Sequence, residues 1–144
     1  WEPWMDEVEK LIKECNVPLY GICFGHQIIC KALGGEVVRA QQGSAFIADV
    51  TYQNGETSKQ LFTHQDHVIH AGEMEVVGSA EHCKIAVCKH PTRPIRTVQF
   101  HPEAVSTLLE YSVECGDMTL DERADFGDGK QDLDVTESLI HPKF

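Results

Sequence analysis

The most informative segment of this sequence is Gly21-Ile22-Cys23-Phe24-Gly25-His26-Gln27, at residues 21–27. An apolar run at 18–22 leads into the cysteine, and a helix-like pattern of apolar residues follows at 24–33. A strand, a sharp turn that carries a nucleophile and a helix follow one another in this way in a nucleophile elbow. Such a turn strains the backbone, so its neighbours must be small, and Gly21 and Gly25 meet that need. The helix N-terminus then favours the thiolate of Cys23 over the thiol.

Outward from this elbow, helices and strands alternate early in the chain and strands cluster late, which is typical of an α/β protein with a mixed sheet. The sequence shows no internal repeats. Polar residues at 41–44 and 61–68 indicate loops, and Gln53-Asn54-Gly55-Glu56 indicates a turn between strands. The predicted helices are 4–15, 24–33 and 104–115, and the predicted strands are 18–22, 36–40, 46–52, 74–80, 85–88 and 95–100.

Composition limits the classes of partner. The chain has 144 residues, 42% of them apolar, which suffices for one globular domain with a core. Twelve basic and 23 acidic residues give a formal charge of -11, which argues against nucleic acid and against an anionic membrane surface. No apolar run is long enough to span a membrane, and no signal-peptide pattern opens the chain.

The six cysteines indicate a reducing compartment. Most of them lie in apolar periodic segments and none forms a CxxC pair, so we expect reduced thiols and a cytoplasmic protein. Apart from Cys23, they fit buried small hydrophobic residues. These five are Cys15, Cys30, Cys83, Cys88 and Cys115.

The second informative segment is Gln99-Phe100-His101-Pro102-Glu103, at the end of a predicted strand and before a helix. A cysteine nucleophile needs a base and a third group that orients the base. His101 is the candidate base, and Glu103 can reach back to its imidazole because Pro102 turns the chain between them. Taken alone, His-Pro-Glu also fits an ordinary helix start. Beside a cysteine elbow, the catalytic interpretation is favoured.

Together the two segments resemble the class I, or triad-type, glutamine amidotransferases, and they occur in that family's order. The stretch Thr63-His64-Gln65-Asp66-His67-Val68 is similar to a segment of the GMP-synthase-like branch. The resemblance runs from about Trp4 to the helix after Glu103. It implies a flavodoxin-like α/β fold with a mixed, mostly parallel sheet and flanking helices.

The resemblance also implies a mechanism without a cofactor. Cys23 attacks the side-chain amide of glutamine, His101 protonates the leaving ammonia, and water hydrolyses the resulting thioester to glutamate. The backbone N–H of Phe24 would be one oxyanion donor. Gln27 matches the family position that contacts the substrate, and His64 and Asp66 would line the pocket. Residues 41–44 lie where the family holds the α-amino and α-carboxyl groups, although their match is poor.

One departure from the family concerns the start of the chain. The family takes its second oxyanion donor from a glycine-rich loop upstream of the region that matches Trp4, and the sequence shows no such loop. We therefore expect residues 1–115 to form a partial amidotransferase domain without its N-terminal strands, inactive or poorly folded in isolation. Residues 116–144 would be an acidic C-terminal extension.

Several alternatives remain open. The same thioester chemistry would serve a γ-glutamyl peptidase or hydrolase, and a regulatory module could retain the elbow without catalysis. No ATP-pyrophosphatase signature occurs, so the chain would be either a stand-alone amidotransferase-like protein or one piece of a larger enzyme, in which a synthetase domain or subunit accepts the ammonia. We expect no metal site. His64, His67 and His70 would share a face only in a helix, and the acidic tail lacks the order of a calcium loop.

Overall fold

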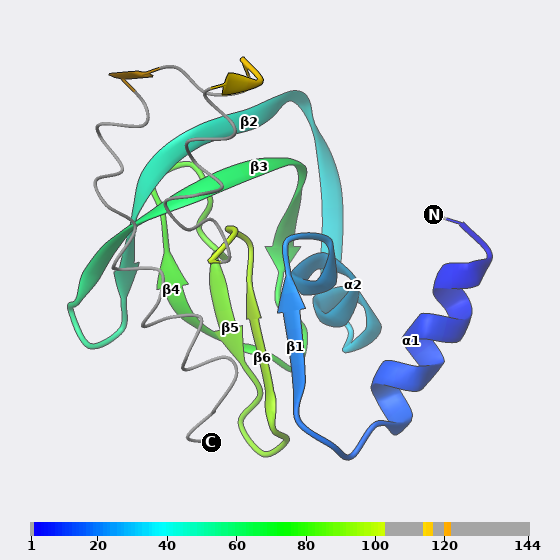
Figure 1. Cartoon of the computed structure of the whole chain (residues 1–144). Helices are drawn as coiled ribbons and strands as arrows, with labels where there is room; N and C mark the ends of the chain where they lie inside the picture. The colour runs from blue at the N-terminus through cyan, green and yellow to red at the C-terminus, as the bar shows by residue number, and fades with distance from the viewer. Residues whose placement is uncertain (1, 103–113, 117–119, 122–144) are drawn as a thin grey trace.

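The structure, a computed structural model, describes residues 2–102, 114–116 and 120–121 of the chain. In this part of the chain, α2 packs beside β1, and α1 packs on α2 (Figure 1). Within the described residues, six strands form a single sheet. The elements are α1 (Trp4–Glu14), β1 (Leu19–Ile22), α2 (Phe24–Ala32), β2 (Glu36–Tyr52), β3 (Thr57–His70), β4 (Glu75–Ser79), β5 (Val87–Lys89) and β6 (Ile95–Val98).

The first helix forms because its apolar residues recur on one face. Ile12 is buried, and Met5 and Val8 pack against the same cluster. The last carbonyls of a helix have no partner within the helix. Here the guanidinium of Arg93 donates to the carbonyl of Ile12 at 2.7 Å and to that of Cys15. The predicted helix at 4–15 is thus confirmed to within one residue.

The second helix ends where the glycine pair predicted it would. Gly34 has a φ of 91°, the left-handed conformation that glycine adopts without penalty. The N–H of Gly35 then donates to the carbonyl of Cys30 at 2.8 Å and satisfies one of the orphan carbonyls. This tight ending turns the chain directly into β2.

The sheet is mixed, with the strand order β1-β6-β5-β4-β2-β3. The α/β class with a mixed sheet and flanking helices is therefore confirmed, and the predicted meander corresponds to β4, β5 and β6. The expectation of a mostly parallel sheet does not hold for the described residues, because only β1 and β6 pair in parallel. Strands β2 to β6 follow one another through short connections, and short connections join antiparallel strands.

A long hairpin replaces two predicted loops. Residues 41–44 belong to β2, where a register irregularity separates Arg39 from Ser44, and residues 61–68 belong to β3. The turn between the two strands lies at Gln53-Asn54-Gly55-Glu56, as predicted. The strand at 61–68 was missed because its buried positions include polar residues. Gln60, Phe62 and His64 are all buried, so the alternation is present but two of the three side chains are polar.

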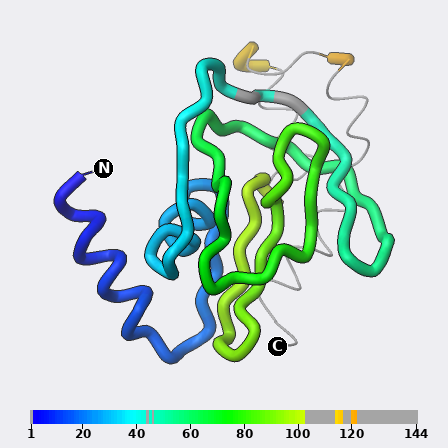
Figure 2. Tube along the Cα trace, turned by 180° about the vertical axis from the view of Figure 1, so that it is seen from behind, coloured from blue at the N-terminus to red at the C-terminus, as the bar shows by residue number. Residues whose placement is uncertain are grey.

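This hairpin, which forms one edge of the sheet, curves over the ends of the other strands, as both views of the backbone show (Figures 1 and 2). Its strand β3 crosses the carboxyl ends of β1 and β6. The carbonyl of Leu61 accepts the N–H of His101 at 2.9 Å, and that of Asp66 accepts the side chain of Gln27 at 3.0 Å. Three elements that are distant in sequence therefore meet at one place.

The core consists of two clusters. Along β5 and β6, successive side chains point to opposite faces of the sheet. Cys88 and Ile95 accordingly join the helix-side cluster, whereas Val87 and Val98 join Phe62 and Phe100 in the other.

Some sequence-based predictions lie outside the described residues. They concern Glu103, almost all of the helix at 104–115, and the acidic extension at 116–144 apart from residues 116, 120 and 121. The division into residues 1–115 and 116–144 therefore stays a prediction. Among the described residues, no helix has the length and apolar character needed to cross a membrane.

Candidate active site

Cys23 lies on a strained turn between β1 and α2. Its φ of 54° and ψ of -103° make it the one non-glycine residue with a positive φ among those that the structure describes. Its N–H donates to the carbonyl of Val98 at 2.9 Å, so the turn is anchored to the end of the neighbouring parallel strand. The predicted strand, strained turn and helix of the elbow are confirmed, while the nucleophilic role of Cys23 stays a prediction. Strain of this kind persists only where the surroundings hold it, and it concentrates at functional sites.

The two glycines of the elbow differ in the space around them. A Cβ on Gly21 would lie 2.6 Å from the carbonyl carbon and oxygen of Gly25, which is far closer than real contacts allow. Gly21 is thus required by the close approach of the strand and the helix. A Cβ on Gly25 would meet nothing within 4 Å, so the expectation that Gly25 must also be small is not supported.

The thiol of Cys23 is half-buried and has two polar neighbours. Sγ lies 3.6 Å from the carbonyl oxygen of Thr63 on β3, to which it can donate. The side-chain Nε2 of Gln99 donates to the same sulfur at 3.7 Å. Gln99 belongs to the second informative segment, but no sequence pattern assigns it a role, because its contact with Cys23 depends on the pairing of β1 with β6.

His101 follows the end of β6, next to the strand that leads to Cys23. Because β1 and β6 run in parallel, their carboxyl ends lie at the same edge of the sheet. The backbone N–H of His101 donates to the carbonyl of Leu61 at 2.9 Å, so His101 is also tied to β3. The predicted nucleophile and base therefore come from adjacent strand ends, whereas Glu103, the predicted orienting acid, lies outside the described residues.

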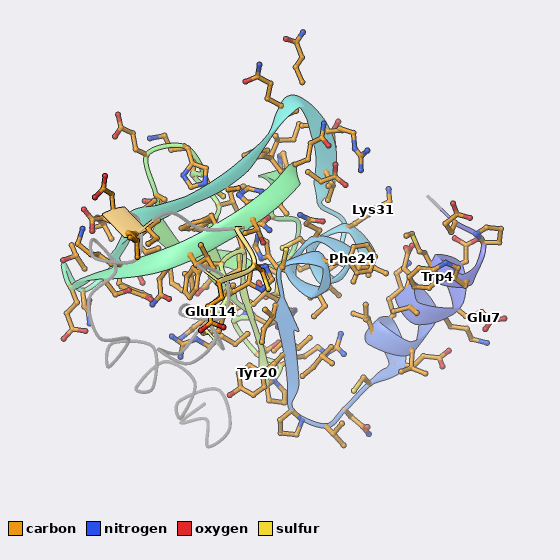
Figure 3. All side chains as sticks on the ribbon, turned by 45° about the horizontal axis from the view of Figure 1, so that its top comes forward. Trp4, Glu7, Tyr20, Phe24, Lys31 and Glu114 are labelled. Carbon is orange, nitrogen blue, oxygen red and sulfur yellow. The ribbon has the colours of Figure 1, made fainter. Side chains whose placement is uncertain are left out.

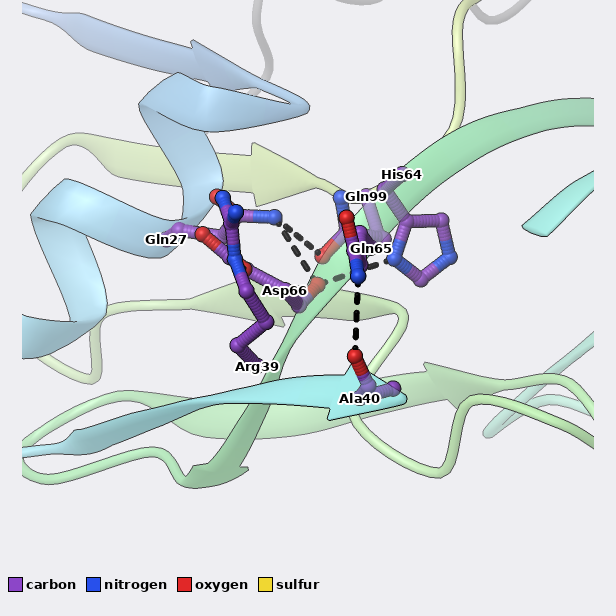
Figure 4. Close-up of polar contacts among 7 residues, drawn as sticks. All are labelled: Gln27, Arg39, Ala40, His64, Gln65, Asp66 and Gln99. Atoms are coloured by element: carbon purple, nitrogen blue, oxygen red, sulfur yellow. Dashed lines mark hydrogen bonds and ion pairs between the residues drawn. The ribbon is translucent and has the colours of Figure 1, made fainter. Parts of the chain in front are cut away.

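Gln27 connects three parts of the site (Figure 4). Its side chain is buried, and Nε2 donates to the carbonyl of Asp66 at 3.0 Å and to Oε1 of Gln99 at 3.3 Å. This amide therefore holds α2, β3 and the end of β6 together. The predicted contact with substrate stays a prediction, and the structure adds a positioning role.

A groove of about 640 Å³ opens beside the elbow helix. Asp66 lines it, and its carboxylate pairs with the guanidinium of Arg39 at 2.8 Å. Phe24 also lines it and faces Trp4 across the gap between α1 and α2, with ring centroids 6.1 Å apart (Figure 3). The complete lining is Glu2, Met5, Phe24, Gln27, Ile28, Lys31, Val37, Val38, Arg39 and Asp66.

His64, two residues before Asp66 on β3, does not line the groove. Its Nδ1 is 2.9 Å from the carbonyl oxygen of Asp66, and its Nε2 is 3.3 Å from Nε2 of His82. Burial lowers the pKa of His64. Two residues were predicted to line the pocket. Asp66 lines the groove, whereas His64 does not and instead contacts His82.

His26, three residues after Cys23, is a core residue. It is fully buried, with Nδ1 2.8 Å from the hydroxyl of Thr97 and Nε2 3.0 Å from the carbonyl of Ile85. Cys30 and Cys88 lie close enough to His26 for the three side chains to share a metal ion. Both ring nitrogens of His26 already have oxygen atoms as hydrogen-bond partners. We therefore interpret this group as a buried hydrogen-bond network of the core and not as a metal site.

Comparison with known proteins identifies the same features in one family. The family described as Glutamine amidotransferase class-I matches residues 4–113. A glutamine-hydrolysing GMP synthase subunit from Pyrococcus abyssi is 30% identical over 128 residues, 76% of this chain and 68% of that protein. The corresponding subunit of Methanocaldococcus jannaschii is 37% identical over 111 residues, 69% of this chain and 56% of that protein.

Solved structures support the fold. A glutamine amidotransferase of Thermotoga maritima superposes with a TM-score of 0.74 at 19% identity, covering 96% of this chain and 66% of that one. Another from Methylobacillus flagellatus has a TM-score of 0.70 at 20% identity, covering 80% of this chain and 51% of that one. The chain thus spans between about half and about two thirds of these four proteins.

Proposed function

This chain belongs to the class I glutamine amidotransferase family, and on that premise we propose that it hydrolyses the side-chain amide of glutamine to glutamate and ammonia. One observation carries the proposal. Cys23 lies on a strained turn at the end of β1. His101 follows the end of the neighbouring parallel strand β6, so both residues lie at the same edge of the sheet. A nucleophile and a base are thereby supplied by two adjacent strand ends.

The reaction that we propose has two halves. His101 takes the proton of the Cys23 thiol, and the sulfur attacks the amide carbon of glutamine. His101 then gives this proton to the leaving nitrogen, ammonia departs, and a γ-glutamyl thioester remains on Cys23. In the second half, His101 removes a proton from water, the hydroxide attacks the thioester carbonyl, and the thiol is restored as glutamate leaves. Glu103 would orient His101 throughout.

The negative charge of each tetrahedral intermediate needs hydrogen-bond donors. Phe24 is the first residue of α2, so its N–H has no acceptor within the helix and adjoins the nucleophile. Donors of this kind typically contribute about 3 kcal/mol to lowering the barrier. We therefore assign the Phe24 N–H to the oxyanion, with the positive end of the helix dipole behind it.

The groove offers charges for the α-amino and α-carboxyl groups of the substrate. Arg39 and Lys31 are cations, and Asp66 and Glu2 are anions, on a single concave surface beside Phe24. An amino acid carries one charge of each sign, which these side chains can pair. The Arg39–Asp66 ion pair keeps both groups in place before substrate arrives.

A second substrate class is supported by the size of the groove. Its volume of about 640 Å³ lies in the range that holds drug-sized ligands. A γ-glutamyl peptide, which needs the same Cys23 thioester but more room than glutamine, would therefore also fit. Comparing glutamine with a γ-glutamyl dipeptide as competitor separates the two substrates.

The ammonia would pass to a synthetase. The two archaeal relatives are named as subunits of GMP synthase, and the chain matches 21% of the longer GMP synthase of Francisella philomiragia at 33% identity. We propose that a synthetase domain or subunit is the partner. We also propose a cytoplasmic site of action, which the free thiols of all six cysteines support.

The experiment is covalent labelling by a diazo-ketone analogue of glutamine, followed by peptide mass analysis. Modification of Cys23 that glutamine suppresses, and that is absent from Cys23→Ser, is the expected result. Failure of folded protein to be labelled at Cys23 would reject a glutaminase and favour a regulatory module. Stronger protection by the γ-glutamyl dipeptide than by glutamine would favour the peptidase.

A further inference from the structure

Four side chains of types that bind transition metals lie close together between β3 and the turn that joins β4 to β5. His64 and His67 come from β3, and His82 and Cys83 come from the turn between β4 and β5. Ligand atoms of His64, His67 and Cys83 all lie within 4.8 Å of one another. Nε2 of His82 lies 3.3 Å from Nε2 of His64. The ring centroids of His64 and His67 are 4.5 Å apart.

The separation of the two imidazole nitrogens fits a shared metal ion. Zn–N bonds of about 2.0–2.1 Å at tetrahedral angles place neighbouring nitrogen ligands about 3.3–3.4 Å apart. The 3.3 Å between His64 and His82 equals that value and exceeds the ordinary range of an N–H hydrogen bond, about 2.7–3.2 Å. Only small movements would therefore be needed to place a metal ion between them.

The hydrogen bonds already prepare His64 as a ligand. The carbonyl oxygen of Asp66 can only accept, so Nδ1 of His64 carries the proton in their 2.9 Å contact. Nε2 of His64 then presents its lone pair toward His82. A backbone carbonyl that fixes the tautomer in this way is the usual outer partner of a metal-bound histidine.

Burial lowers the pKa of His82 to about 4 and lowers that of His64 as well, and it raises the pKa of the Cys83 thiol to about 11. Cys83 currently donates to the carbonyl of Ile85 at 3.6 Å.

We propose that His64, His67, His82 and Cys83 form a binding site for a divalent transition-metal ion of the zinc class. Three imidazoles and one thiolate are a donor set that suits a four-coordinate zinc ion. On binding, the S–H bond of Cys83 breaks, its proton passes to solvent, and the sulfur binds the metal as thiolate. No sequence pattern points to His82 and Cys83 as ligands, since only the fold brings them to β3.

The position of this site would connect it to the reaction centre. Thr63, whose carbonyl lies 3.6 Å from the thiol of Cys23, immediately precedes His64 on β3. A metal ion would fix His64 to the turn between β4 and β5, and thereby fix this segment of β3. Metal binding itself does not depend on the proposed glutaminase activity and is tested without it.

The test uses the full chain, zinc and cobalt salts, and a chromophoric chelator as competitor. We expect one tightly bound Zn²⁺ per chain and, with Co²⁺, a thiolate-to-metal charge-transfer band. Cys83→Ser should abolish that band, and His82→Gln should weaken Zn²⁺ binding at least about tenfold. Cys30→Ser and Cys23→Ser are the matched controls, because each removes a thiol that lies outside the proposed site, and both should keep the site.

Circular dichroism establishes that each variant is folded. Should Cys83→Ser fail to fold, the less buried His82→Gln and the spectrum of the cobalt-loaded wild-type protein decide the matter. Absence of the charge-transfer band from folded wild-type protein would overturn the proposal. So would unchanged zinc affinity in His82→Gln, or loss of the site in Cys30→Ser or Cys23→Ser alone.

Discussion

The side-chain amide of Gln99 bridges Cys23 and the elbow helix, donating from Nε2 to Sγ of Cys23 at 3.7 Å. Its other end, Oε1, accepts from Gln27 at 3.3 Å. Gln99 is fully buried, so the direction of its amide is set by these contacts. The donor faces the sulfur, which is where negative charge develops when the thiol loses its proton. Gln99 is therefore a positioning residue for Cys23.

The first prediction concerns that contact. Gln99→Leu removes a hydrogen bond to a group that becomes charged, and such bonds contribute about 1.5–3 kcal/mol. We expect labelling of Cys23 by the diazo-ketone analogue to slow about tenfold or more. The matched control is Gln60→Leu, since Gln60 is also fully buried but donates to Ser58 on the hairpin. Equal slowing in both variants would show that Gln99 acts only through stability.

The second prediction compares the two glycines of the elbow. Gly21→Ala would place a methyl group 2.6 Å from the backbone of Gly25, so we expect a loss of about 1–3 kcal/mol or more in the free energy of unfolding. Gly25→Ala meets no atom within 4 Å and lies in α2, where alanine is preferred to glycine. It should leave stability unchanged or raise it by up to about 1 kcal/mol. Urea denaturation of both variants measures the difference, and equal stabilities would contradict it.

The third prediction concerns two cysteines with different surroundings. Cys88 is buried, and its hydrogen bond to Cys30, together with burial, raises the pKa of its thiol well above the ordinary range. A raised pKa leaves less thiolate at any given pH, and the thiolate is the form that reacts. At about pH 8, iodoacetamide should therefore modify the exposed Cys115 long before Cys88. Peptide masses over time test this, and comparable rates in folded protein would refute it.

The elbow could be predicted from the sequence because its signals are local. Gly21, the apolar strand and the helix pattern around Cys23 all lie within about one strand and one helix, and the structure confirms them, although it does not support the need for a glycine at position 25. The strand at 61–68 could not be predicted, since polar residues such as His64 occupy its inward positions. Likewise, Gln99 and Cys23 are 76 residues apart in the sequence, so no local sequence pattern predicts their contact.

The last prediction concerns the charged wall of the groove. If the guanidinium of Arg39 pairs with the α-carboxylate of the substrate, Arg39→Ala should raise about tenfold the glutamine concentration that half-protects Cys23 from labelling. The melting temperature should not change, because Arg39 is exposed and ion pairs at the surface add little stability. Lys59→Ala is the matched control. Lys59 forms an exposed ion pair with Asp49 at 3.8 Å on the same hairpin, away from the groove lining. Weaker protection in both variants would point to a general effect of charge, whereas a change confined to Arg39→Ala would place the α-carboxylate of the substrate beside Arg39.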